Sequence, residues 1–276
     1  MKLNKLTKDK LISLYLRDSK SLQEIALLYN VSRVAIFKKL KKYGIKQRSK
    51  SQARIEAQKQ GKAPQEFFDI NEHFFGKWSH EMAYVLGLVI TDGCVSKTGT
   101  ILLSMNDREL LEKVKEALRA SHKIEQSKYQ KGLYIFRFAR EGMIKDLRKL
   151  GIGSKKSLTV RFPNVPQEYL PDFIRGVFDG DGSVFFDKRR PKFPLRSKFV
   201  SSSENFIEKL QKCLEFLDMP KRTIYKQKTK NAYSYMFIYA HKDSSKLFEI
   251  LYKNNQNRLF LERKYERFLE GLKVGT

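Results

Sequence analysis

The stretch from Phe173 to Val184, FIRGVFDGDGSV, decides the fold of this chain. Its apolar residues predict a buried helix, and Gly176 and Gly180 lie four positions apart on one face. A face with almost no side-chain volume indicates that another backbone packs closely against it. Gly182 is expected to end the helix in the left-handed conformation. Asp181 then faces the negative end of the helix dipole, which is unfavourable unless a cation or a proton relay uses the carboxylate.

The same pattern occurs once earlier, from Tyr84 to Val95, which reads YVLGLVITDGCV. Gly87 and Thr91 again place two small residues four apart, and Asp92 precedes a glycine. One copy alone would more simply be a buried helix with a glycine stop, but the duplication favours a functional reading. We expect two helices packed on their small faces, with Asp92 and Asp181 together at one end. Two adjacent carboxylates suit a hard divalent cation such as magnesium.

These stretches resemble the paired signature helices of the LAGLIDADG homing endonucleases. VLGLVITDG, from Val85 to Gly93, and IRGVFDGDG, from Ile174 to Gly182, align with the nine-residue motif. The resemblance covers residues 79 to 270. It implies that the eighth motif residue of each copy, Asp92 or Asp181, binds Mg²⁺ or Mn²⁺.

The resemblance also implies further residues around the metal. The sixth motif position is usually acidic in the family, and here it is Asp179 in the second copy but Ile90 in the first. Family members usually add a lysine and a polar residue, yet the strand ends here read Met-Asn at 105–106 and Ser-Ser at 202–203. The catalytic candidates for the missing lysine are Lys97, Lys188 and Lys198.

The predicted elements of residues 79 to 276 repeat in the order helix, hairpin, helix, hairpin, helix. This order predicts an α+β fold of two αββαββα repeats, each with an antiparallel sheet. The resemblance further implies that the repeats form a pseudo-symmetric duplicated LAGLIDADG domain with saddle-shaped sheets. The expected boundaries are 1–60 for a small all-α domain, 61–78 for a linker, and about 79–155 and 156–276 for the repeats.

Composition points to a polyanionic partner. The chain has 276 residues and a formal net charge of +26, with a pI near 9.9; such an excess favours nucleic acid over a merely lysine-rich surface. Cys94 and Cys213 lack ligand spacing and are expected to pack as small apolar residues. The sequence shows no membrane span and no signal peptide, so we expect a cytoplasmic or organellar protein without membrane contact.

The first 60 residues resemble a helix-turn-helix. Ser21 and Glu24 form a capping box, Ala26 lies at the close-packed position, Asn30 suits the turn, and Ser32 caps the next helix. The expected buried residues are Ile25, Ala26 and Leu28 in the second helix and Ile36 and Leu40 in the third. Residues expected to enter the DNA major groove or hold phosphates are Arg33, Val34, Phe37, Lys38, Lys41 and Lys42. The alternative is a three-helix bundle with a basic face.

Two further basic regions are expected to meet the DNA backbone. Residues 45–62 are hydrophilic, and either order along phosphates or act as a plain linker. In the duplicated domain, one face of each sheet packs on helices and the other is free for DNA. The expected contacts there, including the basic loop KRRPKFPLRSK from Lys188 to Lys198, are Lys128, Arg137, Arg189, Arg190, Arg196, Lys226 and Lys228.

The function that the resemblance implies is a site-specific homing endonuclease of a mobile element such as an intron. It would act as a monomer and make a metal-dependent double-strand break in DNA at a long asymmetric target. The alternatives are a DNA-binding transcription regulator that keeps the scaffold, or an intron-splicing maturase that uses the same surface on RNA. Intein excision is not expected, because the ends MKLNK and KVGT lack the required nucleophile and His-Asn pair.

Overall fold

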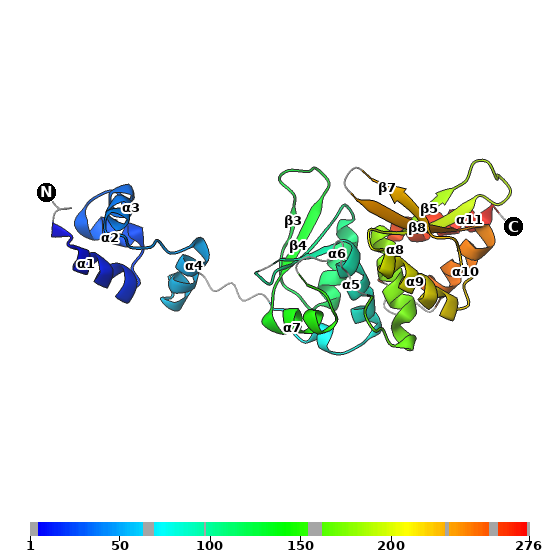
Figure 1. Cartoon of the computed structure of the whole chain (residues 1–276), viewed down its shortest axis with the longest axis horizontal. Coiled ribbons are helices and arrows are strands. Elements are labelled where there is room, and N and C mark those ends of the chain that lie inside the picture. The colour runs from blue at the N-terminus through cyan, green and yellow to red at the C-terminus, as the bar shows by residue number, and fades with distance from the viewer. Residues whose placement is uncertain are drawn as a thin grey trace. The chain divides into compact units, whose positions relative to one another are not determined.

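The computed structural model (Figure 1) describes residues 5–62, 69–96, 98–153, 162–229, 232–253 and 259–274. The chain divides into two compact units, Met1–Phe67 and Phe68–Thr276. Their boundary falls inside the stretch expected to be a linker, 61–78. Lys97 lies outside the described residues, so the structure says nothing of this catalytic candidate.

The small unit is helical. It contains α1 (Lys8–Ile12), the π-helical turn η2 (Ser13–Arg17), α2 (Leu22–Tyr29), α3 (Arg33–Lys42) and α4 (Lys50–Lys59). Its own hydrophobic core consists of Leu6, Leu11, Tyr15, Leu22, Ile25, Ala26, Ile36 and Leu40.

Local signals around α2 and α3 form as the sequence predicts. Ser21 and Glu24 make the reciprocal capping box, and Asn30 adopts the left-handed conformation with φ of 48°. The Ser32 hydroxyl accepts a hydrogen bond from the Ala35 amide at 3.1 Å. The expected burial of Leu28 is wrong, since this side chain is 61% exposed. The buried face of α2 follows the helical i, i+3, i+4 spacing from Leu22, which turns Leu28 to the opposite side.

The segment from 45 to 62 is not a plain linker, because it contains α4 and contacts the first helices. The Arg48 amide donates to the Tyr15 hydroxyl at 2.9 Å, and its guanidinium lies 4.2 Å from the centre of the Tyr15 ring. The same guanidinium donates to the Ser19 carbonyl at 3.1 Å and to the Lys20 carbonyl. Arg48 therefore attaches this segment to the small unit.

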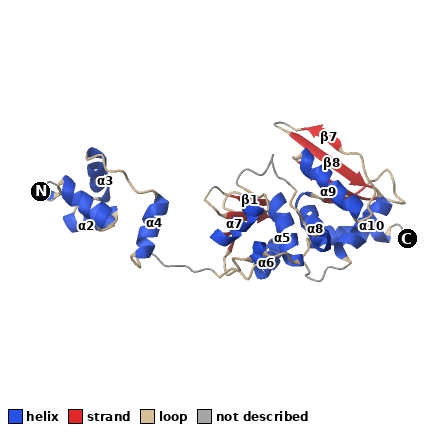
Figure 2. Ribbon diagram, turned by 60° about the horizontal axis from the view of Figure 1, so that its bottom comes forward, coloured by secondary structure: helices blue, strands red, loops and turns tan. Residues whose placement is uncertain are grey.

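The large unit has the expected duplicated α+β fold (Figures 1 and 2). The first repeat consists of α5 (His80–Thr91), β1 (Gly93–Val95), β2 (Ile101–Met105), α6 (Arg108–Ala117), β3 (Ile124–Gln126), β4 (Tyr134–Phe138) and α7 (Glu141–Lys149). The second consists of α8 (Leu170–Asp181), β5 (Ser183–Phe186), β6 (Leu195–Ser201), α9 (Glu204–Phe216), β7 (Tyr225–Lys228), β8 (Tyr233–Tyr239) and α10 (His241–Tyr252), followed by α11 (Glu262–Lys273). Two short 3₁₀ turns, η3 (Phe74–Gly76) and η4 (Gln167–Tyr169), precede the two repeats.

Each repeat forms one antiparallel four-stranded sheet with the same topology. The strand orders are β1-β2-β4-β3 and β5-β6-β8-β7. In the central strand β8, Tyr235, Phe237 and Tyr239 are buried while the residues between them are half-buried. This alternation places one face of the sheet against α9 and α10 and leaves the other face without a helix cover among the described residues.

The aromatic residues before the first repeat belong to the core of the large unit. Phe74 and Phe75 are buried, and their rings meet edge to face at 5.2 Å. The Trp78 ring stacks on Tyr169, with centroids 6.2 Å apart. The second half of the expected linker is therefore structural in the large unit.

The structure also bears on the two cysteines and on membrane spans. Neither Cys94 nor Cys213 forms a disulfide, but Cys94 is exposed and does not pack as an apolar residue. Across the described part of the chain, every helix is too short or too polar to span a bilayer.

Candidate active site and nucleic-acid interface

The seam between α5 and α8 is as tight as the small residues predict. A Cβ at Gly87 would lie 2.5 Å from the Phe173 carbonyl oxygen, and one at Gly176 would collide with the Tyr84 carbonyl. Such distances are incompatible with any side chain. The two helices therefore meet backbone to backbone.

The seam also brings the two motif aspartates to the same end of the helix pair. Gly176 lies against Gly87, and Gly180 lies against Thr91, four residues further along each helix. This register makes the helices parallel, so Asp92 and Asp181 follow at equivalent places. Asp92 is the cap residue after α5 and is half-buried. Asp181 is the last residue of α8 and is exposed.

Each motif aspartate is followed by a glycine, and a side chain at that position would collide with the preceding turn of the helix. Gly182 has φ of −75° and ψ of 167°, so the expected left-handed cap is wrong. A Cβ on Gly182 would lie 2.5 Å from the Phe178 carbonyl oxygen, and one on Gly93 would lie 2.6 Å from that of Val89. The chain turns so sharply from helix into strand that only glycine fits.

A buried lysine that sequence reasoning missed lies beside this helix end. The Lys264 ammonium, from α11, donates to the carbonyls of Phe178 at 2.7 Å, Asp179 at 2.7 Å and Gly182 at 2.6 Å. Burial lowers the pKa of Lys264 to about 8, while the carboxylates of Asp179, Asp92 and Asp181 act to raise it. The ammonium is therefore close enough to both motif aspartates for their charges to act on it.

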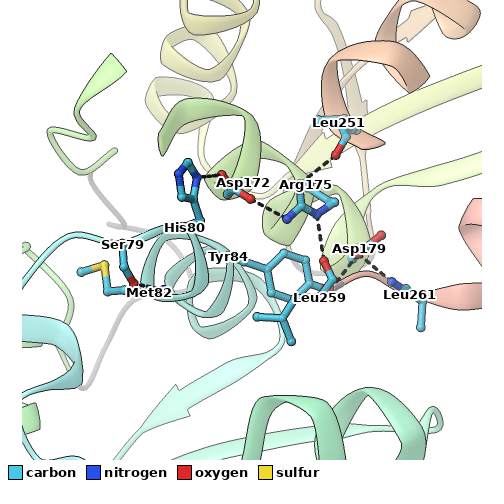
Figure 3. A network of polar contacts seen from close by, with 10 residues as sticks. All are labelled: Ser79, His80, Met82, Tyr84, Asp172, Arg175, Asp179, Leu251, Leu259 and Leu261. Atoms are coloured by element: carbon cyan, nitrogen blue, oxygen red, sulfur yellow. Dashed lines mark hydrogen bonds and ion pairs between the residues drawn. The ribbon is translucent and has the colours of Figure 1, made fainter. Parts of the chain in front are cut away.

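Asp179, at the sixth motif position, anchors the fold and points away from solvent. It is 2% exposed. Its carboxylate accepts hydrogen bonds from the Tyr84 hydroxyl and the Leu261 amide, both at 2.8 Å (Figure 3). Burial raises the pKa of Asp179, and the Lys264 charge opposes that shift. Ile90 occupies the same motif position in the first repeat and is also buried.

A second buried group, Arg175, extends this network toward the other end of α8 (Figure 3). Its guanidinium donates to the carbonyls of Leu259 and Leu251, each at 2.8 Å, and forms an ion pair with Asp172 at 2.6 Å. The other Asp172 oxygen contacts the His80 ring at 2.7 Å. The network ties α8 to α5 and to the chain around α10 and α11. The spacing of the motif gave no sign of these partners, which come from the distant residues 251–261.

Lys188 and Lys198, the described candidates for the catalytic lysine, lie in different parts of the second repeat. In the sheet register, Lys198 is directly opposite Ser183, two positions after Asp181. The equivalent pair in the first repeat is Cys94 opposite Leu102. Lys188 lies in an exposed turn beyond the far end of β5. Of the described candidates, only Lys198 is beside an aspartate-bearing turn.

The strand register places the predicted DNA-contacting residues on different faces of the two sheets. Arg137 is on the helix-free face of the first sheet, where it pairs with Glu125 at 2.7 Å, and Lys128 is exposed in the β3–β4 turn. Lys226 and Lys228 lie opposite Tyr235 and Tyr233, on the side that carries the buried Tyr235. Their expected placement on the open face is therefore wrong, and Tyr225 and Gln227 alternate onto that face.

Arginines of the β5–β6 hairpin also differ in role. Arg196 is only 8% exposed; it donates to the Phe193 and Leu195 carbonyls and lies 3.7 Å from Asp187. By the register Arg196 is on the same helix-free face as Lys198, but its buried side chain is bound within the hairpin. Arg189 is exposed and pairs with Asp187 at 3.0 Å, and Arg190 is exposed.

In the small unit, the residues expected to contact DNA all lie on the surface. The exposed set on α3 is Arg33, Val34, Phe37, Lys38, Lys41 and Lys42. Ile36 and Leu40 point into the core on the opposite side of the helix. The surface of α3 is thus basic with two apolar side chains, a composition suited to a nucleic-acid groove.

Asp92 and Asp181 could together hold a hard divalent ion, because carboxylate oxygens are the ligands that such ions prefer. Among the described residues, no group of three or more His, Cys, Asp or Glu side chains could enclose a metal. A cation held by Asp92 and Asp181 would therefore need further oxygen ligands from outside these two side chains.

Comparisons with known proteins agree with this architecture. The sequence model of the LAGLIDADG-like domain matches residues 79–159 and 168–270, more than half of the chain. A Methanocaldococcus jannaschii protein named probable translation initiation factor IF-2 is 30% identical over 135 residues, which is 46% of this chain and 11% of that protein. The chain therefore spans about a ninth of that relative's length.

Solved structures give weaker similarity. The homing endonuclease I-DmoI, in a study of mesophilic variants, is 15% identical with a TM-score of 0.45, covering 63% of this chain and 96% of that one. The meganuclease I-SmaMI bound to DNA is 12% identical with a TM-score of 0.47, covering 70% and 89%. Full-length DUF199/WhiA from Thermotoga maritima is 15% identical with a TM-score of 0.45, covering 74% and 65%. The assignment rests on the sequence match and on the two glycine-seamed helices: this chain belongs to the LAGLIDADG-like domain family.

Proposed function

We propose that this protein is a site-specific, metal-dependent DNA endonuclease that cuts both strands of a long asymmetric target. The observation that carries the proposal is the pair of aspartates, Asp92 and Asp181, at equivalent ends of two parallel helices. A pure binding protein has no need for two carboxylates at the unfavourable end of a helix dipole.

Asp92 and Asp181 would hold Mg²⁺ or Mn²⁺, which when bound supplies an activated water and neutralises charge on the leaving oxygen. The protein's own part is to fix both carboxylates at one place between its two sheets. The tight seam does this, because neither helix can slide without a backbone clash at Gly87 or Gly176.

The open sheet faces and the small unit would position the DNA. Arg137 and Lys198 lie on those faces by the strand register, and the basic excess of +26 supplies the long-range attraction. The exposed side of α3 would add base and phosphate contacts at one end of the site. As a monomer with unequal halves, the protein would read an asymmetric sequence.

The test is selection of duplexes from a random DNA pool, followed by addition of Mg²⁺ to the bound fraction. We expect double-strand cleavage by the unchanged protein. Asp92→Asn and Asp181→Asn should each abolish that cleavage and leave DNA affinity in Ca²⁺ nearly unchanged. Glu249→Gln, which alters a surface ion pair on α10, is the matched control and should cut normally.

Three results would contradict the proposal. Normal cleavage by either aspartate variant would place the chemistry elsewhere. Tight, selective DNA binding without cleavage under Mg²⁺ or Mn²⁺ would make the protein a DNA-binding regulator, and preferential selection of RNA from a mixed pool would favour a maturase.

A further inference from the structure

The aspartate at the end of α8 has a neighbour that belongs to a different helix, α11. Lys264 is 5% exposed although it carries a charge. Its ammonium lies 5.5 Å from the centre of the Phe178 ring and reaches the last turn of α8. A buried lysine is unfavourable unless its donors are satisfied. Here they meet four carbonyls, those of Phe178, Asp179, Gly180 and Gly182.

These four carbonyls surround Asp181 in sequence. The Gly180 carbonyl, at 3.4 Å, precedes it, and the Gly182 carbonyl, at 2.6 Å, follows it. One ammonium therefore holds the backbone on both sides of the aspartate. The last helical carbonyls have no amide partner within a helix, so a donor at this position stabilises the turn.

Helix α11 is itself held from both repeats. Arg263, the residue before Lys264, donates to the Asp107 carboxylate at 3.0 Å, and Asp107 directly precedes α6 of the first repeat. Glu262 of α11 lies 3.5 Å from Lys113 of α6. Contacts with both halves fix where the ammonium sits.

The negative charges at the C-terminal end of α8 also favour the Lys264 ammonium at this position. The C-terminal end of α8 carries the negative end of the helix dipole, and Asp181 adds a full negative charge there. The Lys264 ammonium offsets both. The unfavourable position of Asp181 is thus supported from within the protein, before any metal binds.

We infer that Lys264 is a positioning residue for Asp181, which clamps the last turn of α8 so that this carboxylate is preset to bind a divalent cation. The inference rests on the proposed function and deepens it, because it assigns the preparation of one metal ligand to a helix outside the motif. The simpler alternative is a lysine that only stabilises the core.

The experiment uses the full-length protein with Lys264→Met and Lys264→Gln. Methionine removes both the charge and the hydrogen bonds, whereas the glutamine amide keeps donors without the charge. Leu210→Ala is the matched control, because Leu210 is buried in α9 of the same repeat and its loss lowers stability without touching the α8 turn.

Two measurements separate positioning from stability. The first is hydrogen exchange at the Gly182 amide, which donates to the Phe178 carbonyl at 2.8 Å and reports opening of the last turn. The second is Mn²⁺ affinity of the protein bound to a selected duplex, followed by electron paramagnetic resonance.

We expect Lys264→Met to speed exchange at Gly182 about 10-fold relative to Leu210→Ala. It should weaken Mn²⁺ binding by about 10- to 100-fold, as loss of outer residues around a metal does. Lys264→Gln should fall between Lys264→Met and the unchanged protein in both measurements, and Leu210→Ala should bind Mn²⁺ normally.

Unchanged or tighter Mn²⁺ binding in Lys264→Met would overturn the inference, since removal of a nearby positive charge acting alone would tighten binding. Failure of both lysine variants to fold would also overturn it, and would make Lys264 a folding residue. If the unchanged protein holds no Mn²⁺ on a selected duplex, the proposed endonuclease itself is overturned, and the inference with it. The first two failures leave the endonuclease proposal intact, so the results distinguish them.

Discussion

The two repeats share one topology, but they hold their motif helices in different ways. In the first repeat, α5 carries Leu86 and Ile90 where the second repeat has Arg175 and Asp179. Helix α5 is therefore fixed at these positions by apolar packing, while α8 is fixed by buried charges that reach residues 251–264. The strand opposite each motif turn differs too, with Lys198 in the second repeat where the first has Leu102.

This difference teaches that a duplicated domain within one chain need not keep its halves equivalent. The seam of small residues is shared by both helices, so it is under the same steric constraint from either side. The residues that surround each motif helix on its other sides are not shared. Each half can therefore fix its aspartate with its own neighbours, and in the second half Lys264 of α11 contacts the end of the motif helix.

The largest effect should come from the shared seam. Gly176→Leu and Gly87→Leu should each prevent folding of the large unit, because a side chain there meets backbone that cannot relax. Gly153→Leu is the matched control, since a Cβ at Gly153 meets no atom within 4 Å. Circular dichroism and thermal melting check the outcome. A soluble Gly176→Leu protein with an unchanged melting temperature would show that the seam is not shared.

The next largest effect tests the different neighbours that hold the two motif helices. Asp179→Ala removes the acceptor of Tyr84 and Leu261 and leaves the Lys264 charge without its buried partner. We expect a loss of about 3–5 kcal/mol in unfolding free energy. Ile90→Val, at the same motif position in the first repeat, should lose only about 1 kcal/mol. Urea denaturation measures both, and equal losses would mean that the two motif helices are held alike.

A smaller effect concerns chemistry at the two turns. Lys198→Met should slow cleavage of one DNA strand by about 10²-fold, as loss of a charged donor near a reacting phosphate does. The other strand should be cut at nearly the normal rate. Lys228→Met is the matched control, because Lys228 lies on the opposite face of the same sheet. Strand-specific end labels give the two rates, and an equal slowing of both strands would argue against unequal halves.

The smallest effect is a pH dependence of stability without metal. Burial lowers the pKa of Lys264 to about 8 from 10.5. Above pH 8 the unfolded chain binds more protons than the folded protein, so stability should rise with pH from about 8 toward 10.5. Between pH 8 and 9.5 this contribution should reach about 2 kcal/mol.

Lys264→Met should lose that rise, while Lys253→Met, at an exposed ion pair on α10, should keep it. Urea denaturation at a series of pH values is the measurement. The comparison should stop near pH 10, because the buried tyrosines Tyr84 and Tyr252 have pKa values raised by burial and begin to act there. An identical pH slope in Lys264→Met would assign the rise to other groups.

The sequence by itself determined the elements and the seam. Glycine has no side chain, so Gly87 and Gly176 report a close backbone approach directly, and the order of helices and strands follows from local periodicity. Strands β2 (Ile101–Met105) and β8 (Tyr233–Tyr239) belong to the hairpins that this order predicts. The placement of Asp92 and Asp181 at one end of two packed helices follows from the same local pattern.

Tertiary structure decided what surrounds those aspartates. Lys264 follows Asp181 by 83 positions in the chain, and no local spacing predicts that its ammonium caps α8. The faces of Lys226 and Lys228 depended on strand register, since a shift of one residue reverses the side of every residue in a strand. The burial of the Arg196 side chain against Asp187 and Phe193 likewise depends on the folded hairpin. Local sequence sets helices, turns and small faces because those depend on neighbours in the chain, whereas long side chains find partners only after the chain has folded.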